Sequence, residues 1–164
     1  MLNKKIEKAL NKQINHEFHT TYSYLGIATW FASQNLPGFA HWMNVQSAEE
    51  RTHALKFIGI VEDRGGRVEL EAVGRPQSDF RTAKDAIATA LKLEQATTAL
   101  INALYSLAVE EKDYATQSAL KWFVDEQVEE EKSVGEVLAK MQMAGDSKGT
   151  LLMLDHQAAK RGKS

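Results

Sequence analysis

The residues with the clearest chemical potential in this sequence are carboxylates that fall where a helical core would place leucine. Steps of three and four residues define an apolar stripe in each of four long periodic segments. The metal-binding side chains on these stripes are Glu17, Glu50, His53, Glu94, Gln127 and Glu130. Because an isolated buried charge costs roughly several kcal/mol, these groups need a counter-charge, which two divalent metal ions would supply.

Glu50 and His53 are one helical turn apart and form a Glu-x-x-His motif. Many solvated helices contain this motif by chance, and a single Glu on a predicted stripe is usually a surface residue placed out of phase. Here the motif coincides with two further inward acids and with Gln127-x-x-Glu130, which matches the ligand pattern of carboxylate di-iron bundles. Since the sequence has no Cys, the ligand atoms are oxygen and nitrogen, which suit iron or manganese.

Four long helices and one short helix are predicted to position these groups. Asn35-Leu36-Pro37-Gly38 and Gly65-Gly66 end the first two segments, and further breaks follow the third and fourth. The predicted helices span about 5–34, 38–64, 81–111, 115–144 and 150–159. Each inward acid falls near the middle of its helix, so one layer of a bundle can collect all of them.

Short links make the first two helices an antiparallel hairpin, and the third and fourth another. The connection of about 16 residues between the second and third helices is long enough, at roughly 3.3 Å per residue, to run the length of the bundle. The sequence therefore predicts an all-α four-helix bundle with a single crossover, forming one domain over residues 1–164.

The composition excludes several other classes of protein. The net charge is only −2 and no long basic run occurs, so we expect neither nucleic acid nor an anionic membrane as a partner. No stretch is apolar over the roughly 20 residues that a membrane-spanning helix needs. The first residues lack a secretory apolar segment, so we expect a cytoplasmic protein.

At these positions the chain resembles the bacterial non-haem ferritins over essentially its whole length. The matching residues are Glu17, Tyr24, the run Glu49-Glu50-Arg51-Thr52-His53, Glu94 and the run from Trp122 to Lys132. The resemblance implies a ferritin-like four-helix bundle with one long crossover and a short C-terminal fifth helix. It also implies iron as the metal and assembly of 24 chains into a hollow shell.

The resemblance also implies a role for each site residue. Glu17, Glu50 and His53 would bind the first iron, and Glu50 would bridge to a second iron held by Glu94. The residues adjacent to the second iron are Gln127 and Glu130.

Three further acids and a tyrosine have two interpretations each. Glu49, Glu126 and Glu129, together with Glu130, match a third iron site of some bacterial ferritins, whereas the residues alone favour a solvated acidic face. By the resemblance, Tyr24 donates an electron or a hydrogen bond near the metals. The alternative is a core tyrosine that bonds a carboxylate.

Haem is not expected in this chain. Bacterioferritins have a second Glu-x-x-His motif on the last long helix, and a methionine directly after the ligand Glu of the second helix binds haem. The corresponding positions here are Glu130 and Arg51.

The implied function is iron storage by a ferroxidase that oxidises Fe(II) with O2 or H2O2 and deposits ferric oxyhydroxide inside the shell. One rival is a di-iron oxidase that stores no iron and remains dimeric. A second rival is a metal-free helical scaffold whose acids face solvent. Away from the acid layer, we expect a solvated tail over 160–164 and surface positions for His16, His19, His41 and His156.

Overall fold

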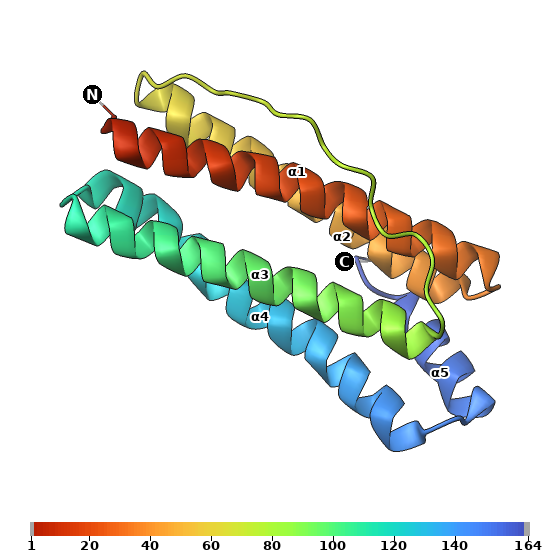
Figure 1. Cartoon of the computed structure of the whole chain (residues 1–164). Helices are drawn as coiled ribbons and strands as arrows, with labels where there is room; N and C mark the ends of the chain where they lie inside the picture. The colour runs from red at the N-terminus through yellow and green to blue at the C-terminus, as the bar shows by residue number, and fades with distance from the viewer. Residues whose placement is uncertain (1, 163–164) are drawn as a thin grey trace.

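Five helices and no strand make up the computed structural model, which describes residues 2–162 (Figure 1). The helices are α1 (Lys4–Ser33), α2 (Pro37–Asp63), α3 (Ala83–Glu110), α4 (Tyr114–Ala144) and α5 (Lys148–Ala158). Every boundary lies within two residues of the one predicted from the sequence. The all-α prediction is confirmed.

The helix starts are fixed by local chemistry. One side chain before each of α1, α3, α4 and α5 accepts a hydrogen bond from a backbone N–H of the first turn, and these residues are Asn3, Thr82, Asp113 and Ser147. Pro37 begins α2, where its missing N–H has no partner to lose. Because these signals are local, they were readable from the sequence.

The long helices form two antiparallel hairpins, α1 with α2 and α3 with α4 (Figure 1). The crossover between α2 and α3 runs along the outside of α1, so α3 starts at the end of the bundle opposite the end of α2 (Figure 1). Near the start of α3, the buried Phe80 packs edge-on against Trp30, with ring centroids 5.4 Å apart. The crossover is therefore packed against the bundle at its far end.

Helix α5 lies across the end of the bundle where α4 ends and packs against the start of α2 (Figure 1). Oδ1 of Asp155 accepts a hydrogen bond of 2.8 Å from the backbone N–H of Phe39. A Cβ on Gly38 would lie only 1.7 Å from the carbonyl oxygen of Asp155. Glycine is therefore required where α2 and α5 meet.

The apolar core is divided into two parts along the bundle. One cluster, beside α5, contains Phe31 and Trp42, and the other, at the opposite end, contains Leu10 and Phe57. In each long helix the residues of one cluster are separated from those of the other by a buried acid. The separating acids are Glu17, Glu50, Glu94 and Glu130. A polar layer therefore crosses the middle of the bundle.

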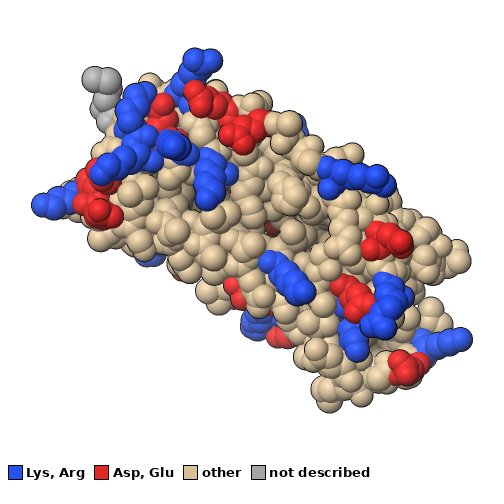
Figure 2. Space-filling view, viewed as in Figure 1, with Lys and Arg blue, Asp and Glu red and all other residues tan. Residues whose placement is uncertain are grey.

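The face shown in Figure 2 has basic and acidic side chains interspersed, with a broad area between them that carries neither kind. On this face, charges of one sign therefore form no continuous patch (Figure 2). No helix among residues 2–162 contains an apolar stretch long enough to cross a membrane.

Candidate metal centre

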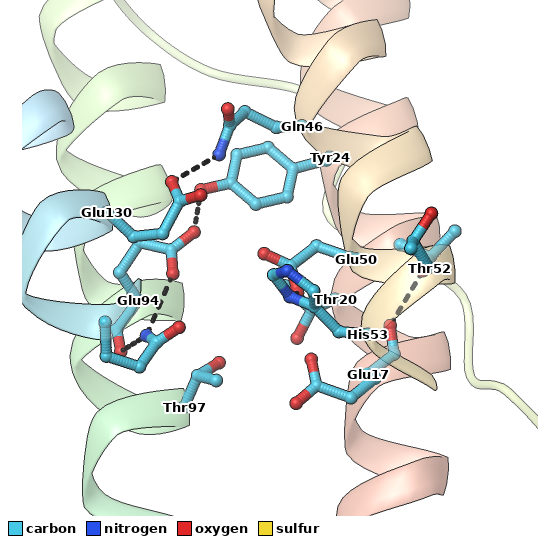
Figure 3. Close-up of polar contacts among 12 residues, drawn as sticks. Glu17, Thr20, Tyr24, Gln46, Glu50, Thr52, His53, Glu94, Thr97 and Glu130 are labelled. Carbon is cyan, nitrogen blue, oxygen red and sulfur yellow. Dashed lines mark hydrogen bonds and ion pairs between the residues drawn. The ribbon is translucent and has the colours of Figure 1, made fainter. Parts of the chain in front are cut away.

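The six ligand-type side chains predicted on the inward stripes are all buried. The exposed fraction is 0% for Glu17, Glu50 and Glu94. It is at most 8% for the other three, His53, Gln127 and Glu130. Two come from α2, two from α4 and one each from α1 and α3. Figure 3 shows Glu17, Glu50, His53, Glu94 and Glu130 together in the polar layer, and Gln127 joins them by its hydrogen bond to Glu94.

Glu17, Glu50 and His53 form the most compact part of the layer. Each offers a ligand atom, and these atoms lie within 4.8 Å of one another. Nδ1 of His53 is 3.1 Å from Oε2 of Glu50, one turn earlier on α2. Oε2 of Glu17 and Oε1 of Glu50 are buried without a hydrogen-bond partner. Because a buried carboxylate oxygen rarely lacks a partner, these two oxygens fit a divalent cation.

Glu94 and Glu130 face this group from the other hairpin (Figure 3). The hydroxyl of Tyr24 donates a hydrogen bond to Oε1 of Glu94, and Nε2 of Gln127 lies 3.2 Å from its Oε2. Oε2 of Glu130 accepts a hydrogen bond of 2.7 Å from Nε2 of Gln46. Both oxygens of Glu94 and one oxygen of Glu130 are therefore held by neutral donors from other helices.

The acids of the layer destabilise one another's charged forms. Burial, and then the neighbouring Glu50, raise the pKa of Glu17 well above its usual value. Burial and the charge of Glu94 raise the pKa of Glu50 in the same way, and they raise that of Glu130 to about 7. Burial also raises the pKa of Glu94, although the bond from Tyr24 opposes the shift. Bound cations would relieve this repulsion and favour the carboxylates.

The acids predicted for a third iron site lie at the edge of this layer. Glu49 and Glu129 are exposed and Glu126 is half-buried. Glu49, Glu129 and Glu130 line one pocket of about 340 Å³, together with Gln46. The compact ligand group does not include these three outer acids, and the third site stays a prediction.

Two buried glutamines support the layer and were not predicted as site residues. Nε2 of Gln13 donates a hydrogen bond of 2.6 Å to Oε1 of Glu17, and Gln46 bonds Glu130. Both lie on inward stripes, four residues before an inward acid. That spacing was the signal available in the sequence.

Two of the four histidines predicted at the surface are half-buried instead. His16 lies between α1 and α3, with Nε2 2.8 Å from Oγ1 of Thr97, and burial lowers its pKa to about 4. His41 has Nε2 2.8 Å from the carbonyl oxygen of Arg161. The surface prediction was wrong here because neighbouring segments cover both rings. The other two histidines are exposed as predicted.

The prediction of a solvated tail over 160–164 is wrong for Arg161. Its guanidinium carbon lies 4.2 Å from the centroid of the Trp42 ring, and Nη1 donates a hydrogen bond to Oγ of Ser133. The tail folds back onto α2 and α4, which no local sequence pattern encodes. Residues 163–164 of the predicted tail lie outside the described residues.

Comparison with known proteins agrees with this geometry. The family model of the ferritin-like domain matches residues 7–144. The chain is 35% identical over 161 residues to the bacterial non-heme ferritin of Staphylococcus aureus strain USA300, covering 98% of this chain and 97% of that protein. It is 36% identical to the Staphylococcus saprophyticus protein of the same name, covering 98% and 96%.

Solved structures give the same result. An open pore ferritin from the archaeon Archaeoglobus fulgidus is 41% identical, with a TM-score of 0.96 and coverage of 98% of this chain and 99% of that chain. A form of the Archaeoglobus fulgidus ferritin engineered to be closed is 40% identical, with a TM-score of 0.96 over 100% of both chains. The chain therefore belongs to the ferritin family.

Proposed function

We propose that this protein stores iron and is a ferroxidase, which oxidises Fe(II) with O2 in the polar layer of the bundle and deposits the Fe(III) product as oxyhydroxide. Iron is the substrate and the cargo of this reaction. Each Fe(II) gives one electron to the oxidant, and hydrolysis of the Fe(III) product releases protons. The relatives that share this fold and most of this chain's length are named as ferritins.

The observation that carries the proposal is the pair of buried, unpartnered oxygens on Glu17 and Glu50 beside His53. A metal-free scaffold would pair these oxygens or expose them to water. Carboxylates are hard anionic ligands that stabilise Fe(III) relative to Fe(II), so this donor set favours the oxidation.

We assign the ligands by their positions in the layer. Glu17, Glu50 and His53 bind one iron. Glu94 binds a second, with Gln127 and Glu130 beside it. Glu50 would bridge the two, because its carboxylate lies 3.1 Å from His53 on one side and Glu94 faces it from the other hairpin (Figure 3). Tyr24 positions the Glu94 carboxylate through its hydroxyl.

Further proposals accompany this assignment. Glu49, Glu126 and Glu129, with Glu130, bind a third iron at the edge of the layer. Twenty-four copies of the chain, each one ferritin-like domain over residues 1–164, enclose the mineral, because storage requires a container that one bundle cannot provide. The protein acts in the cytoplasm, takes no haem, and uses either O2 or H2O2 as the oxidant.

The test is aerobic addition of about two equivalents of Fe(II) per chain, with ferric absorbance followed by stopped flow. Wild type is compared with Glu50→Ala and with Glu62→Ala, which removes an exposed acid from the same helix. We expect Glu50→Ala to slow oxidation by more than the roughly 10- to 100-fold that loss of a group supporting a metal ligand costs, and Glu62→Ala to match wild type. Size-exclusion chromatography of all three measures assembly.

Each rival function predicts a different outcome. Equal slow oxidation by wild type and Glu50→Ala would contradict the di-iron centre and favour the metal-free scaffold. Fast, Glu50-dependent oxidation in a particle of only two chains would favour an oxidase that stores no iron. Fast oxidation in a large shell that retains Fe(III) supports the proposed function.

A further inference from the structure

Arg161 and Gly162, in the segment after α5, lie over the side of the polar layer. We call these two residues the clasp. Three contacts fix Arg161: its carbonyl oxygen is 2.8 Å from Nε2 of His41, its guanidinium stacks on Trp42, and Nη1 donates to Ser133. A cation over an aromatic ring, when partly desolvated, is held more strongly than an exposed ion pair. The side chain is half-buried and joins α2 to α4.

Gly162 continues this contact. A Cβ at this position would lie 2.9 Å from both methyl carbons of Val45, and the backbone has φ +69°, which favours glycine. The clasp therefore follows a specific path across α2 and does not lie loosely on the surface.

The clasp borders a pocket of about 340 Å³ that reaches the metal layer. The inner wall contains Gln46 and Glu130, which are buried and bonded to each other. The outer wall contains the exposed acids Glu49 and Glu129, and Arg161 completes it. A cation that moved through this pocket would travel between carboxylates and would pass the guanidinium.

We propose that Arg161 is a cationic gate on this pocket, and that its charge slows the passage of divalent metal between the outside of the chain and the centre. The inference rests on the proposed function, since it requires a metal in the polar layer. Without metal, the guanidinium offsets the acids of the pocket wall. When a divalent cation enters the pocket, the guanidinium of Arg161 repels it. The metal passes quickly only if the guanidinium moves away from the Trp42 ring.

Charge is what distinguishes this role from a structural one. Arg161→Gln removes the charge and keeps a polar side chain, whereas Arg161→Lys keeps the charge and loses the planar guanidinium. Lys160→Gln removes the same charge from the exposed neighbour and is the matched control. None of these changes touches a predicted metal ligand.

The probe is Zn²⁺, which binds oxygen and nitrogen ligands without redox chemistry. Stopped flow measures Zn²⁺ uptake by the metal-free assembled protein, and its release to a zinc-sensitive dye, for wild type and the three variants. We expect Arg161→Gln to accelerate both by about tenfold at low salt, at the low end of electrostatic effects on association rates. Lys160→Gln should stay near the wild-type rates, and Arg161→Lys, which keeps the charge but loses the planar stack on Trp42, should accelerate exchange less than Arg161→Gln.

Salt provides a second readout. At roughly 1 M salt the Debye length is about 3 Å, so the difference between wild type and Arg161→Gln should shrink towards unity if it is electrostatic. A variant that acts by loosening the fold would keep its difference at high salt. Ser133→Ala, which frees the guanidinium but leaves its charge, should accelerate exchange less than Arg161→Gln.

The outcomes separate the gate from the proposed function. If Zn²⁺ binding depends on Glu50 but wild type and Arg161→Gln take up and release Zn²⁺ at equal rates, the gate is overturned. The proposed function would still stand in that case. Equal acceleration in Arg161→Gln and Arg161→Lys also overturns it, because the charge would then be irrelevant. If Glu50→Ala binds as much Zn²⁺ as wild type, the metal centre itself is wrong.

Discussion

Gln46 donates a hydrogen bond of 2.7 Å from Nε2 to Oε2 of Glu130, so an amide of α2 holds an acid of α4. Gln46 lies four residues before Glu50 on the same face, yet its amide bonds across the bundle. Gln13, four residues before Glu17, instead bonds the acid of its own helix at 2.6 Å. One amide therefore orients a ligand locally, and the other joins the two hairpins through the metal layer.

Replacing Gln46 by Leu should weaken metal binding at the second position. Burial and the charge of Glu94 raise the pKa of Glu130 to about 7, and the hydrogen bond from the Gln46 amide opposes that rise. Without the amide that pKa rises further, and less carboxylate is present at pH 7. We expect Zn²⁺ affinity to fall about tenfold by calorimetry, the effect of one hydrogen bond to a charged group. Gln142→Leu, on the exposed side of α4, should bind like wild type.

The metal-free protein should become less stable as pH rises from 5.5 to 7.5. The pKa of Glu130 is about 7 in the folded chain against 4.5 for an ordinary Glu, so the folded state binds more protons than the unfolded state in this range. The free energy of unfolding then falls with pH by up to about 1.4 kcal/mol per pH unit for each such acid.

Urea unfolding of the metal-free protein at several pH values measures this slope. Glu130→Gln, which removes one titrating group, should make it shallower. Zn²⁺ should reverse its sign, since metal binds the carboxylates and competes with protons. Because the pKa of His16 is lowered to about 4, this ring adds a slope of opposite sign below its usual pKa of 6.5. A stability that does not fall between pH 6.5 and 7.5 without metal would show that these acids are ionised in the empty layer.

Tyr24→Phe distinguishes the two roles left open for this tyrosine. The hydroxyl bonds Glu94 and opposes the rise of its pKa, so its loss should weaken Zn²⁺ binding by about fivefold, although Zn²⁺ exchanges no electron. If Tyr24 acts only as an electron donor, Zn²⁺ affinity should stay unchanged while Fe(II) oxidation slows. Both measurements are made on the same preparations, with Tyr105→Phe, half-buried on α3, as the control.

Gln127→Glu should slow repeated turnover of the centre. The amide donates to both the backbone and the carboxylate of Glu94, and Glu can do neither when ionised. The extra negative charge would also hold Fe(III) more tightly. We expect the second addition of Fe(II) to be oxidised about tenfold more slowly than the first, while the two additions match in wild type. Gln142→Glu adds the same charge to the exposed side of α4; equal loss of turnover in both variants would point to a general charge effect.

Helices and inward acids were predictable because their signals are local and periodic. Pro37 marks the start of α2. Each apolar stripe keeps its phase over many turns, so Glu17 and Glu94 lie on the buried face even if a helix end is misplaced by a few residues. The core on both sides of the layer then fixes the acids at one depth. The layer follows from helix phase and length alone.

The remaining features depend on contacts between elements. The sequence shows that Gln46 points inward, but the distance between α2 and α4 decides that it bonds Glu130 instead of Glu50. His16 is covered because α3 packs against α1, and Arg161 because the tail turns back over Trp42. No repeat within one helix contains that information.

Two asparagines of α1 hold the crossover in place. Nδ2 of Asn11 donates to the carbonyl oxygen of Arg67 at 2.8 Å, and Oδ1 accepts from the N–H of Glu69 at 2.7 Å. Asn15 repeats the pattern two residues further along the crossover, bonding Glu69 and Glu71. The two amides thus satisfy alternate backbone groups, as a neighbouring strand would.

Asn11→Leu should loosen the crossover without disturbing the metal centre. Asn11 is 8% exposed, and the substitution removes its two partly buried hydrogen bonds to the backbone of the crossover, at a cost of about 1 kcal/mol for each bond. Trypsin should then cut after Arg67, in the crossover, several times faster than in wild type, while Zn²⁺ stoichiometry is unchanged. Asn102→Leu, exposed on α3, is the control. Cleavage at the wild-type rate would mean that the packing of Phe80 alone holds the crossover, because that contact remains when the amide is removed.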